Sequence, residues 1–283
     1  MAGMNATPSR PRVLSIAGTD PTGGAGIQAD LKSIMAAGGY GMSVVTALVA
    51  QNTRGVRSIH TPPQEFLIEQ LECVFDDVVC DGVKVGMLGD VRTLDTVSSF
   101  LASHPVPVLV IDPVTIASIG DRLLTREAED ALRQFTGMAD VITPNIPELA
   151  LLAKTDIPRG EDEAVAVAKK YAESTGTVVI VKMGHLTGPE AGNIAVRPDG
   201  RTHAVSSPRI DTTNTHGTGC SLSSALATRM AGGSSVEEAL DWATPWLNGA
   251  IQAGAKLRVG GSNGPVDHGA GVCSTMETKN SSI

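Results

Sequence analysis

The chain has 283 residues, of which 42% are hydrophobic and only 3% aromatic, and its formal net charge is −8. This length suffices for one large domain with a core of mainly aliphatic side chains. The acidic balance, without a basic stripe interleaved with aromatic residues, counts against nucleic-acid binding. The four cysteines lack metal-site spacing and suit reduced thiols. No apolar run has the length of a membrane span or signal peptide, so we expect a cytoplasmic protein without membrane contact.

Six short apolar runs predict buried strands, and a helical pattern follows most of them. The first run, residues 13–17, leads into a glycine-rich turn at 18–26 and then a helix over 27–37. The remaining strands are expected at 43–50, 82–88, 108–111, 141–143 and 178–181, with helices at 64–75, 91–103, 125–135 and 161–175. This alternation predicts an α/β fold with a mostly parallel sheet and helices on both of its faces.

The last third of the chain departs from this alternation. Residues 192–207 have the pattern of an antiparallel hairpin at the sheet edge. A buried helix is expected from Ser221, and a long final helix over 235–256. From Asn263 the composition is polar and predicts loose chain. We therefore expect a single domain over 13–265, with flexible tails at 1–11 and 268–283.

Polar residues recur where the predicted strands end. Because the carboxyl ends of parallel strands share one edge of a sheet, we expect these residues to converge on one crevice. Taken singly, each has an ordinary explanation as a turn residue or a solvated charge. The convergent set comprises the 18–26 turn, Gln51, Met87, Asp112, Asn145, Glu148, Lys182 and residues 217–220.

The segment from Gly217 to Cys220 stands where the helix beginning near Ser221 should start. Glycines allow successive N–H groups to face one point, and a helix N-terminus adds unpaired donors and partial positive charge. The segment therefore predicts an anion site. A plain tight loop capped by Thr218 or Ser221 is the alternative.

Phosphoryl transfer fits this set, because that reaction depends mostly on positioning and charge stabilisation. Oxygens of Asp112, Asn145 and Glu148 suit Mg²⁺ or its water ligands. Lys182 supplies a cation, and the backbone N–H groups of 217–219 can surround developing negative charge.

Several longer stretches make the interpretation more specific. They are Ala17 to Asp30 (AGTDPTGGAGIQAD), Ala50 to Thr53 (AQNT), Lys84 to Leu88 (KVGML), Asp112 to Val114 (DPV), Thr143 to Glu148 (TPNIPE) and Asn214 to Cys220 (NTHGTGC). Together they resemble the ribokinase-type vitamin kinases, most closely the phosphomethylpyrimidine kinases of thiamine biosynthesis. The resemblance covers about residues 13–265 and implies a ribokinase-like three-layer α/β/α sandwich.

The resemblance also implies roles for individual residues. An aminopyrimidine ring would lie near Gly18, Ala25, Asp30, Gln51, Met87 and Val114. ATP would lie against Asp112, Asn145, Glu148, Lys182, Thr215, Gly217, Thr218 and Gly219, with Mg²⁺ at Asp112 and Glu148, partly through water. The catalytic set would be Cys220, Gly217, Gly219 and Lys182. ATP with Mg²⁺ is the implied cofactor, a monovalent cation is allowed, and the expected partners are a small aminopyrimidine phosphate and a second copy in a homodimer.

Cys220 stands where the wider family carries an aspartate general base. A helix N-terminus lowers a thiol pKa, so we expect a Cys220 thiolate that can accept a hydroxyl proton. The family performs two steps, phosphorylation of hydroxymethylpyrimidine and then of its monophosphate. The phosphate acceptor is already an anion and needs no base, and we expect this second step as the main activity, with the first step as an addition.

Two departures from the family pattern flank the expected phosphate region. Ser118 and Ile119 replace a usual Lys-Ser pair, and Met183 replaces a usual glycine. Three alternatives stay open: a pyridoxal or pyridoxine kinase, a hydrolase with Cys220 as nucleophile and His216 or His185 as base, and a non-catalytic nucleotide sensor.

Overall fold

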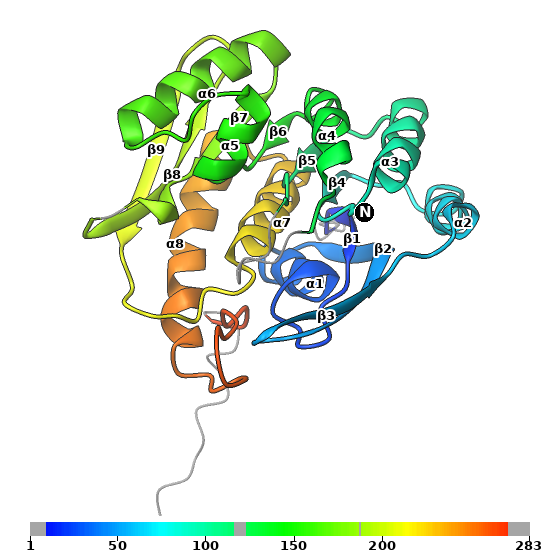
Figure 1. Ribbon diagram of the computed structural model, residues 1–283, viewed down its shortest axis with the longest axis horizontal. Coiled ribbons are helices and arrows are strands. Elements are labelled where there is room, and N and C mark those ends of the chain that lie inside the picture. Colours follow the sequence, from blue (N-terminus) through cyan, green and yellow to red (C-terminus); the bar gives the residue numbers. More distant parts are fainter. Residues whose placement is uncertain (1–9, 116–122, 187, 271–283) are drawn as a thin grey trace, which may run out of the picture.

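The computed structural model describes residues 10–115, 123–186 and 188–270. At the centre of this part lies a nine-stranded sheet in the order β3-β2-β1-β4-β5-β6-β7-β8-β9 (Figure 1). The strands are β1 Arg12–Gly18, β2 Tyr40–Asn52, β3 Gly55–His60, β4 Gly82–Val85, β5 Leu109–Ile111, β6 Val141–Ile142, β7 Val178–Lys182, β8 Glu190–Val196 and β9 Thr202–Pro208. All neighbours from β2 to β7 are parallel, as predicted.

Both edges of the sheet are antiparallel hairpins. The β8–β9 hairpin confirms the prediction for 192–207. The β2–β3 hairpin at the other edge was not predicted, because only 43–50 has an apolar pattern. β3 is largely exposed and therefore carries no apolar run that would indicate a strand.

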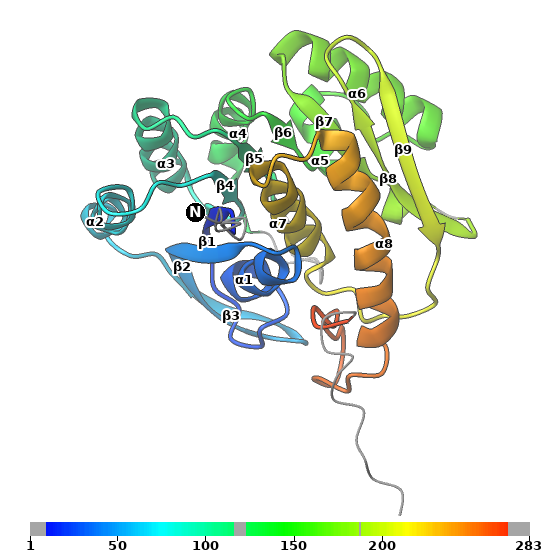
Figure 2. The same cartoon turned by 180° about the vertical axis from the view of Figure 1, so that it is seen from behind.

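Helices cover both faces of the sheet, which confirms the three-layer sandwich (Figures 1 and 2). β1 shows the period of two: Val13 packs into the core beneath α1, α7 and α8, and Leu14 and Ile16 pack into the core beneath α2 to α6. The helices are α1 Gly26–Ala36, α2 Gln64–Phe75, α3 Val91–Ser103, α4 Glu129–Thr136, α5 Ile146–Ala153, α6 Glu161–Thr175, α7 Thr218–Ala231 and α8 Val236–Gly254, with short 3₁₀ turns at Arg126–Ala128 and Met183–His185. No helix in the described ranges is long and apolar enough to cross a membrane.

One further helix, α5, was not predicted because its two prolines suggest a turn. Pro147 lies in the first turn of α5, where a missing N–H costs nothing. Asn145 and Glu148 form a capping box: each side chain accepts a hydrogen bond from the other's backbone N–H, both at 2.8 Å. The TPNIPE stretch is therefore a helix start directly after β6.

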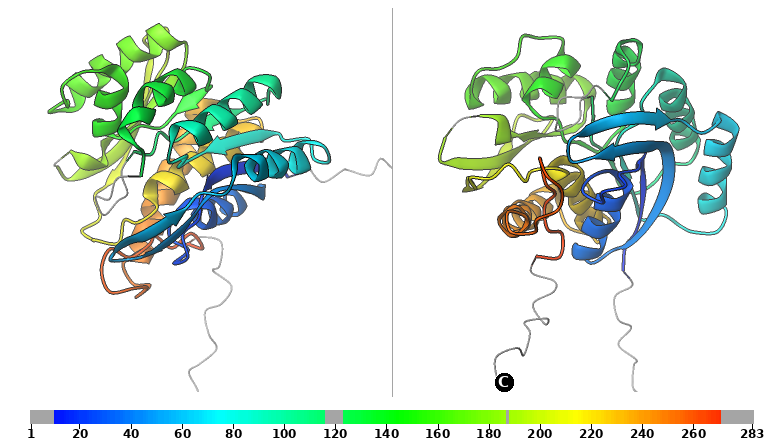
Figure 3. Two further views of the ribbon diagram at one scale, coloured as in Figure 1. Left: turned by 45° about the vertical axis from the view of Figure 1, so that its right-hand side comes forward. Right: turned by 60° about the horizontal axis from the view of Figure 1, so that its bottom comes forward.

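Residues 264–268 are packed, so the prediction of loose chain from Asn263 on is wrong there. Val266 and His268 are only 2% and 6% exposed. Ser221 Oγ and His268 Nε2 lie 2.9 Å apart, and the N–H of Asp267 donates to Ala250 O in α8. The segment that follows α8, drawn in orange-red, lies beside the end of this helix in Figure 3. The sequence did not indicate this packing, because residues 264–268 are mostly polar or small and have no periodic apolar pattern. Ser118, Ile119 and residues 1–9 and 271–283 of the predicted tails lie outside the described residues.

Candidate functional site

A cavity of about 640 Å³ opens at the carboxyl ends of the parallel strands. It is lined from both halves of the sequence, and the loops after β1, β4, β5, β6 and β7 meet there with the start of α7. The convergence predicted from the polar strand ends is therefore found. The predicted residues that line the cavity are Gly18, Ala25, Gln51, Met87, Asp112, Val114, Asn145, Glu148, Lys182, Thr215, Gly217, Thr218, Gly219 and Cys220.

The first wall is the loop after β1, which Asp20 organises. Its fully buried carboxylate accepts the N–H groups of Gly24 and Ala25 at 3.1 and 2.8 Å and both donors of Thr22. Burial raises the pKa of Asp20, but hydrogen bonds from His216 and Thr22 outweigh it, so the pKa lies well below its usual range. The loop thus presents Ala25 and Gly26 to the cavity in a fixed conformation.

A second wall, in contact with the first, is the N-terminus of α7. Gly217 precedes the helix with φ +84°, a conformation that favours glycine. A Cβ at Gly219 would lie 3.2 Å from Lys182 Nζ and 3.3 Å from Asp112 Oδ2. The absence of a side chain at Gly219 therefore lets the positive end of the helix approach this ion pair closely.

Lys182 is the cation of the site and binds two carboxylates. Its Nζ lies 2.8 Å from Asp112 Oδ1 and 3.6 Å from Glu148 Oε2, and Thr143 donates to the same Asp112 oxygen at 3.0 Å. Burial lowers the pKa of Lys182, but the charges of Asp112 and Glu148 raise it by a larger amount, so the net shift is upward. Burial raises the pKa of Glu148 to about 7, against the opposing effect of Lys182. The side chains of these three residues are mostly withdrawn from solvent, unlike the solvated charges of the alternative interpretation.

The two predicted magnesium ligands differ in what remains free. The Glu148 carboxyl accepts backbone N–H groups from Asn145 and Thr115, and the Asn145 side-chain oxygen is used in the same cap. Asp112 Oδ1 is also used, whereas Asp112 Oδ2 faces the start of α7. Mg²⁺ usually takes one or two carboxylates and completes its shell with water and phosphate. Asp112 fits such a ligand directly, and Glu148 fits one acting through water. The described residues hold no group of three or more His, Cys, Asp or Glu suited to a metal.

Cys220 lies in the first turn of α7, as predicted, but its acidity is opposite to the expectation. Burial raises the pKa of its thiol to about 11, and the charges of Asp30 and Asp112 add to this. Lys84 and a hydrogen bond from the Gly26 N–H act in the other direction without balancing it. The prediction of a lowered thiol pKa is therefore wrong, because desolvation and two nearby carboxylates disfavour the thiolate.

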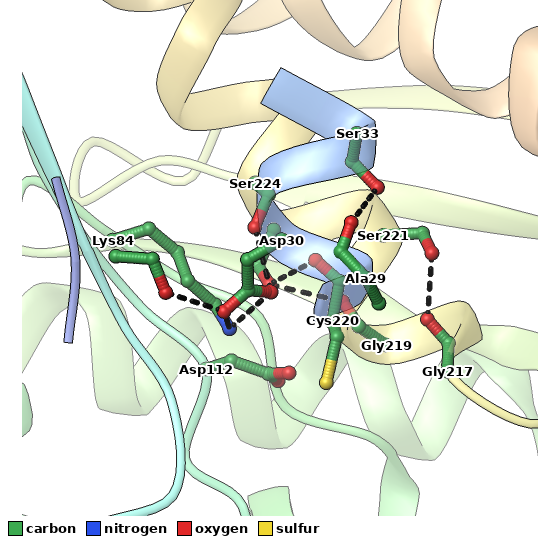
Figure 4. A network of polar contacts seen from close by, with 12 residues as sticks. Ala29, Asp30, Ser33, Lys84, Asp112, Gly217, Gly219, Cys220, Ser221 and Ser224 are labelled. Carbon is green, nitrogen blue, oxygen red and sulfur yellow. Dashed lines mark hydrogen bonds and ion pairs between the residues drawn. The ribbon is translucent and has the colours of Figure 1, made fainter. Parts of the chain in front are cut away.

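Asp30 is the exception among the predicted residues, since it does not line the cavity. It is fully buried and binds Lys84 Nζ through both oxygens, at 2.8 and 2.9 Å (Figure 4). Ser15 and Ser224 donate to the same carboxylate at 2.6 and 2.9 Å. The resemblance places the aminopyrimidine ring near Asp30, but in the structure this carboxylate is enclosed by its donors, and its partner Lys84 lines the cavity instead.

Lys84 and Asp20 were given no role of their own from the sequence, and His216 was considered only as the base of the hydrolase alternative. Lys84 carried a usable signal, because a lysine inside an apolar strand must find a buried partner. For Asp20 the signal is an acidic side chain followed by glycine amides. His216 gave none, since its partner Asp20 is 196 positions away in the sequence.

Comparison with known proteins assigns this α/β/α architecture to a family. The model of the phosphomethylpyrimidine kinase family matches residues 20–267. The hydroxymethylpyrimidine/phosphomethylpyrimidine kinase of Salmonella typhimurium is 42% identical over 92% of this chain and 97% of its own. A crystal structure of Bacillus subtilis pyridoxal kinase in complex with ADP is 31% identical, with a TM-score of 0.82 over 93% of this chain and 98% of that one.

These similarities define the class first: the chain has the fold of the small-molecule vitamin kinases. Within that class, it belongs to the phosphomethylpyrimidine kinase family. A thiamine biosynthesis multifunctional protein of Corynebacterium glutamicum, ThiED, is 60% identical over 93% of this chain. The chain spans only 34% of the length of that protein.

Proposed function

We propose that the protein transfers the γ-phosphoryl group of ATP to 4-amino-5-hydroxymethyl-2-methylpyrimidine phosphate, which yields the diphosphate for thiamine biosynthesis. The observation that carries the proposal is the meeting of Lys182, Asp112 and the N-terminus of α7 within one cavity. A cation and a row of backbone donors at one point suit a phosphoryl group in transfer. Family membership and the ADP complex of the B. subtilis enzyme support a nucleotide at this end.

The residues divide the work in the following way. Gln51 and Met87 line the part of the cavity near the loop after β1, where an amide and an apolar side chain suit the aminopyrimidine ring. Lys182 and the N–H groups of 217–219 orient the transferred group, whose bond to ADP breaks as the bond to the acceptor oxygen forms. Asp112 would hold Mg²⁺, with Glu148 acting through water. The ion would neutralise phosphate charge.

Cys220 favours the second step over the first. An alcohol acceptor must lose a proton, and a thiol with a pKa of about 11 is almost entirely protonated at neutral pH and offers little base. The phosphate acceptor is already ionised. The same raised pKa counts against the hydrolase alternative, which needs a thiolate nucleophile. Pyridoxal remains the main competing substrate because of the B. subtilis structure.

The test is ATP consumption with the alcohol, its monophosphate and pyridoxal, each compared by kcat/KM. We expect the monophosphate to be preferred and Cys220→Ala to keep most of that activity. Cys80→Ala is the matched control, because Cys80 is also a free thiol whose pKa is raised to about 11 by burial but lies outside the cavity lining. Preference for pyridoxal, or loss of monophosphate turnover in Cys220→Ala alone, would contradict the proposal. The homodimer, the monovalent cation and the cytoplasmic location stay predictions.

A further inference from the structure

Two loops from opposite ends of the sequence meet at one buried hydrogen bond beside the cavity. His216 Nε2 lies 2.8 Å from Asp20 Oδ2. Asp20 is fully buried and His216 is only 7% exposed. The hydrogen bond thus joins the loop after β1, on the proposed pyrimidine side, to the residue that precedes the anion-binding start of α7.

The two loops are closely packed around this hydrogen bond. A Cβ at Gly24 would lie 2.6 Å from His216 Cδ2, and a Cβ at Gly217 would lie 1.7 Å from Gly24 O. The two backbones can be this close only because both positions are glycine. In addition, the Gly26 N–H donates to the Cys220 sulfur.

Each partner is also fixed on its own side. Asp20 holds Gly24 and Ala25 through their N–H groups. The backbone of His216 pairs with the C-terminal segment: its N–H donates to Gly264 O at 3.1 Å, and its carbonyl accepts from Val266 at 3.4 Å. A displacement of one loop is therefore passed to the other rather than absorbed by it.

The imidazole serves this one partner. Its Nδ1 is buried and has no hydrogen-bond partner among the described residues. Because Asp20 is held as a carboxylate by four further donors, it can only accept, and His216 Nε2 must carry the proton. This contact therefore requires an N–H donor at the position of His216 Nε2.

We propose that the Asp20–His216 hydrogen bond couples the two halves of the cavity, so that a nucleotide at the start of α7 tightens binding of the aminopyrimidine at the loop after β1. His216 is then a positioning residue. The inference rests on the proposed function for the identity of the two ligands. Coupling of this kind is reciprocal and typically changes an affinity about 5-fold or more.

The first experiment measures the Kd of the hydroxymethylpyrimidine monophosphate with and without saturating β,γ-methylene-ATP. For the wild type we expect at least about 5-fold tighter binding with the analogue present. His216→Gln, which places an amide N–H near the Nε2 position, should keep most of this ratio, whereas His216→Leu should bring it close to one. A merely structural role would lower Tm and weaken both ligands without changing the ratio.

The second experiment uses the nucleotide analogue alone, by hydrogen–deuterium exchange. β,γ-Methylene-ATP should slow exchange of the 20–26 amides in the wild type and His216→Gln but not in His216→Leu. A wild-type ratio of one, or binding of the analogue without protection of these amides, overturns the coupling even if the variants fail to fold. A monophosphate that does not bind overturns the proposed function alone, and an analogue that does not bind overturns both.

Discussion

The site contains two lysine–carboxylate pairs with the same 2.8 Å separation but different surroundings. In the Lys84–Asp30 pair both side chains are completely buried. In the Lys182–Asp112 pair the lysine is 16% exposed and faces the cavity, while the carboxylate is 2% exposed.

What separates them is how completely the carboxylate is used. Asp30 receives Lys84 on both oxygens, Ser15 on one and Ser224 on the other. Asp112 has its donors on Oδ1, and its Oδ2 faces the helix end. A saturated pair can only stabilise the arrangement around it, whereas an unsaturated one can exchange partners with a ligand. The first pair should therefore matter for folding and the second for catalysis.

Removal of Lys84, the cation of the completely buried pair, should give the largest loss of stability. Lys84→Met leaves the Asp30 charge buried without its counter-ion, which typically costs about 3–5 kcal/mol of unfolding free energy. Urea unfolding of the protein without ligands measures this loss. The double variant Lys84→Met/Asp30→Asn removes both charges and should recover much of it. Wild-type stability in Lys84→Met would show that the pair is not structural.

Removal of the outer cation should act on the rate instead. Lys182→Met takes away a charge aimed at the transferred group, and loss of one such donor typically lowers kcat by about 10²–10³-fold. Because Lys182 is 16% exposed and Thr143 still donates to Asp112 in its absence, we expect the Tm of Lys182→Met to fall less than that of Lys84→Met. Lys169→Met is the control for loss of one positive charge at an exposed position of α6. If Lys182→Met lowered Tm as much as Lys84→Met and left kcat nearly unchanged, the two pairs would not differ in role.

The fold could be predicted because its elements are amphipathic or apolar over several residues. The parallel strands and most helices follow from that pattern alone. β3 could not be predicted, since an exposed strand buries almost nothing, and α5 was hidden by prolines that are favourable at a helix start. Residues 264–268 fold against the loop before α7 through backbone hydrogen bonds, which leave no mark in composition.

The site could be predicted in membership but not in detail. Strand ends share an edge in any parallel sheet, which explains why Gln51, Asp112 and Lys182 meet. The predictions for Asp30 and for the acidity of Cys220 fail because of burial and buried charged neighbours: Asp30 is enclosed with Lys84, and burial together with two carboxylates raises the Cys220 pKa. Those are properties of three-dimensional neighbours, and no local spacing encodes them.

Glu148 allows a finer test of the outer pair through pH. Its pKa of about 7 exceeds the ordinary carboxyl value, so between about pH 4.5 and 7 the folded state holds a proton that the unfolded chain has lost. This contribution to stability is complete below that window and is lost as pH rises through it. Glu148→Gln keeps the helix cap and should make unfolding free energy nearly independent of pH in this window. We expect this effect to be smaller than the effects of the two lysine substitutions. Buried His268, with a pKa of about 4, gives the opposite slope in both proteins and cancels in the difference. Parallel curves for the two proteins would contradict the raised pKa.

Arg197 and Glu237 form a third ion pair that extends the comparison to the surface. Two hydrogen bonds of 2.6 and 2.7 Å join the end of β8 to the first turn of α8, and both are shorter than the hydrogen bonds in the two lysine–carboxylate pairs. The side chains of Arg197 and Glu237 are, however, 28% and 30% exposed. Solvent competes for both groups, so Arg197→Ala should cost only about 0.2–1 kcal/mol. Glu237 keeps a favourable place near the helix N-terminus, and salt should reduce the loss further. Urea unfolding at low and high salt measures it, with Arg201→Ala, at a more exposed pair, as the control. A loss as large as that of Lys84→Met would mean that hydrogen-bond geometry, rather than burial of the charge left behind, sets what an ion pair contributes here.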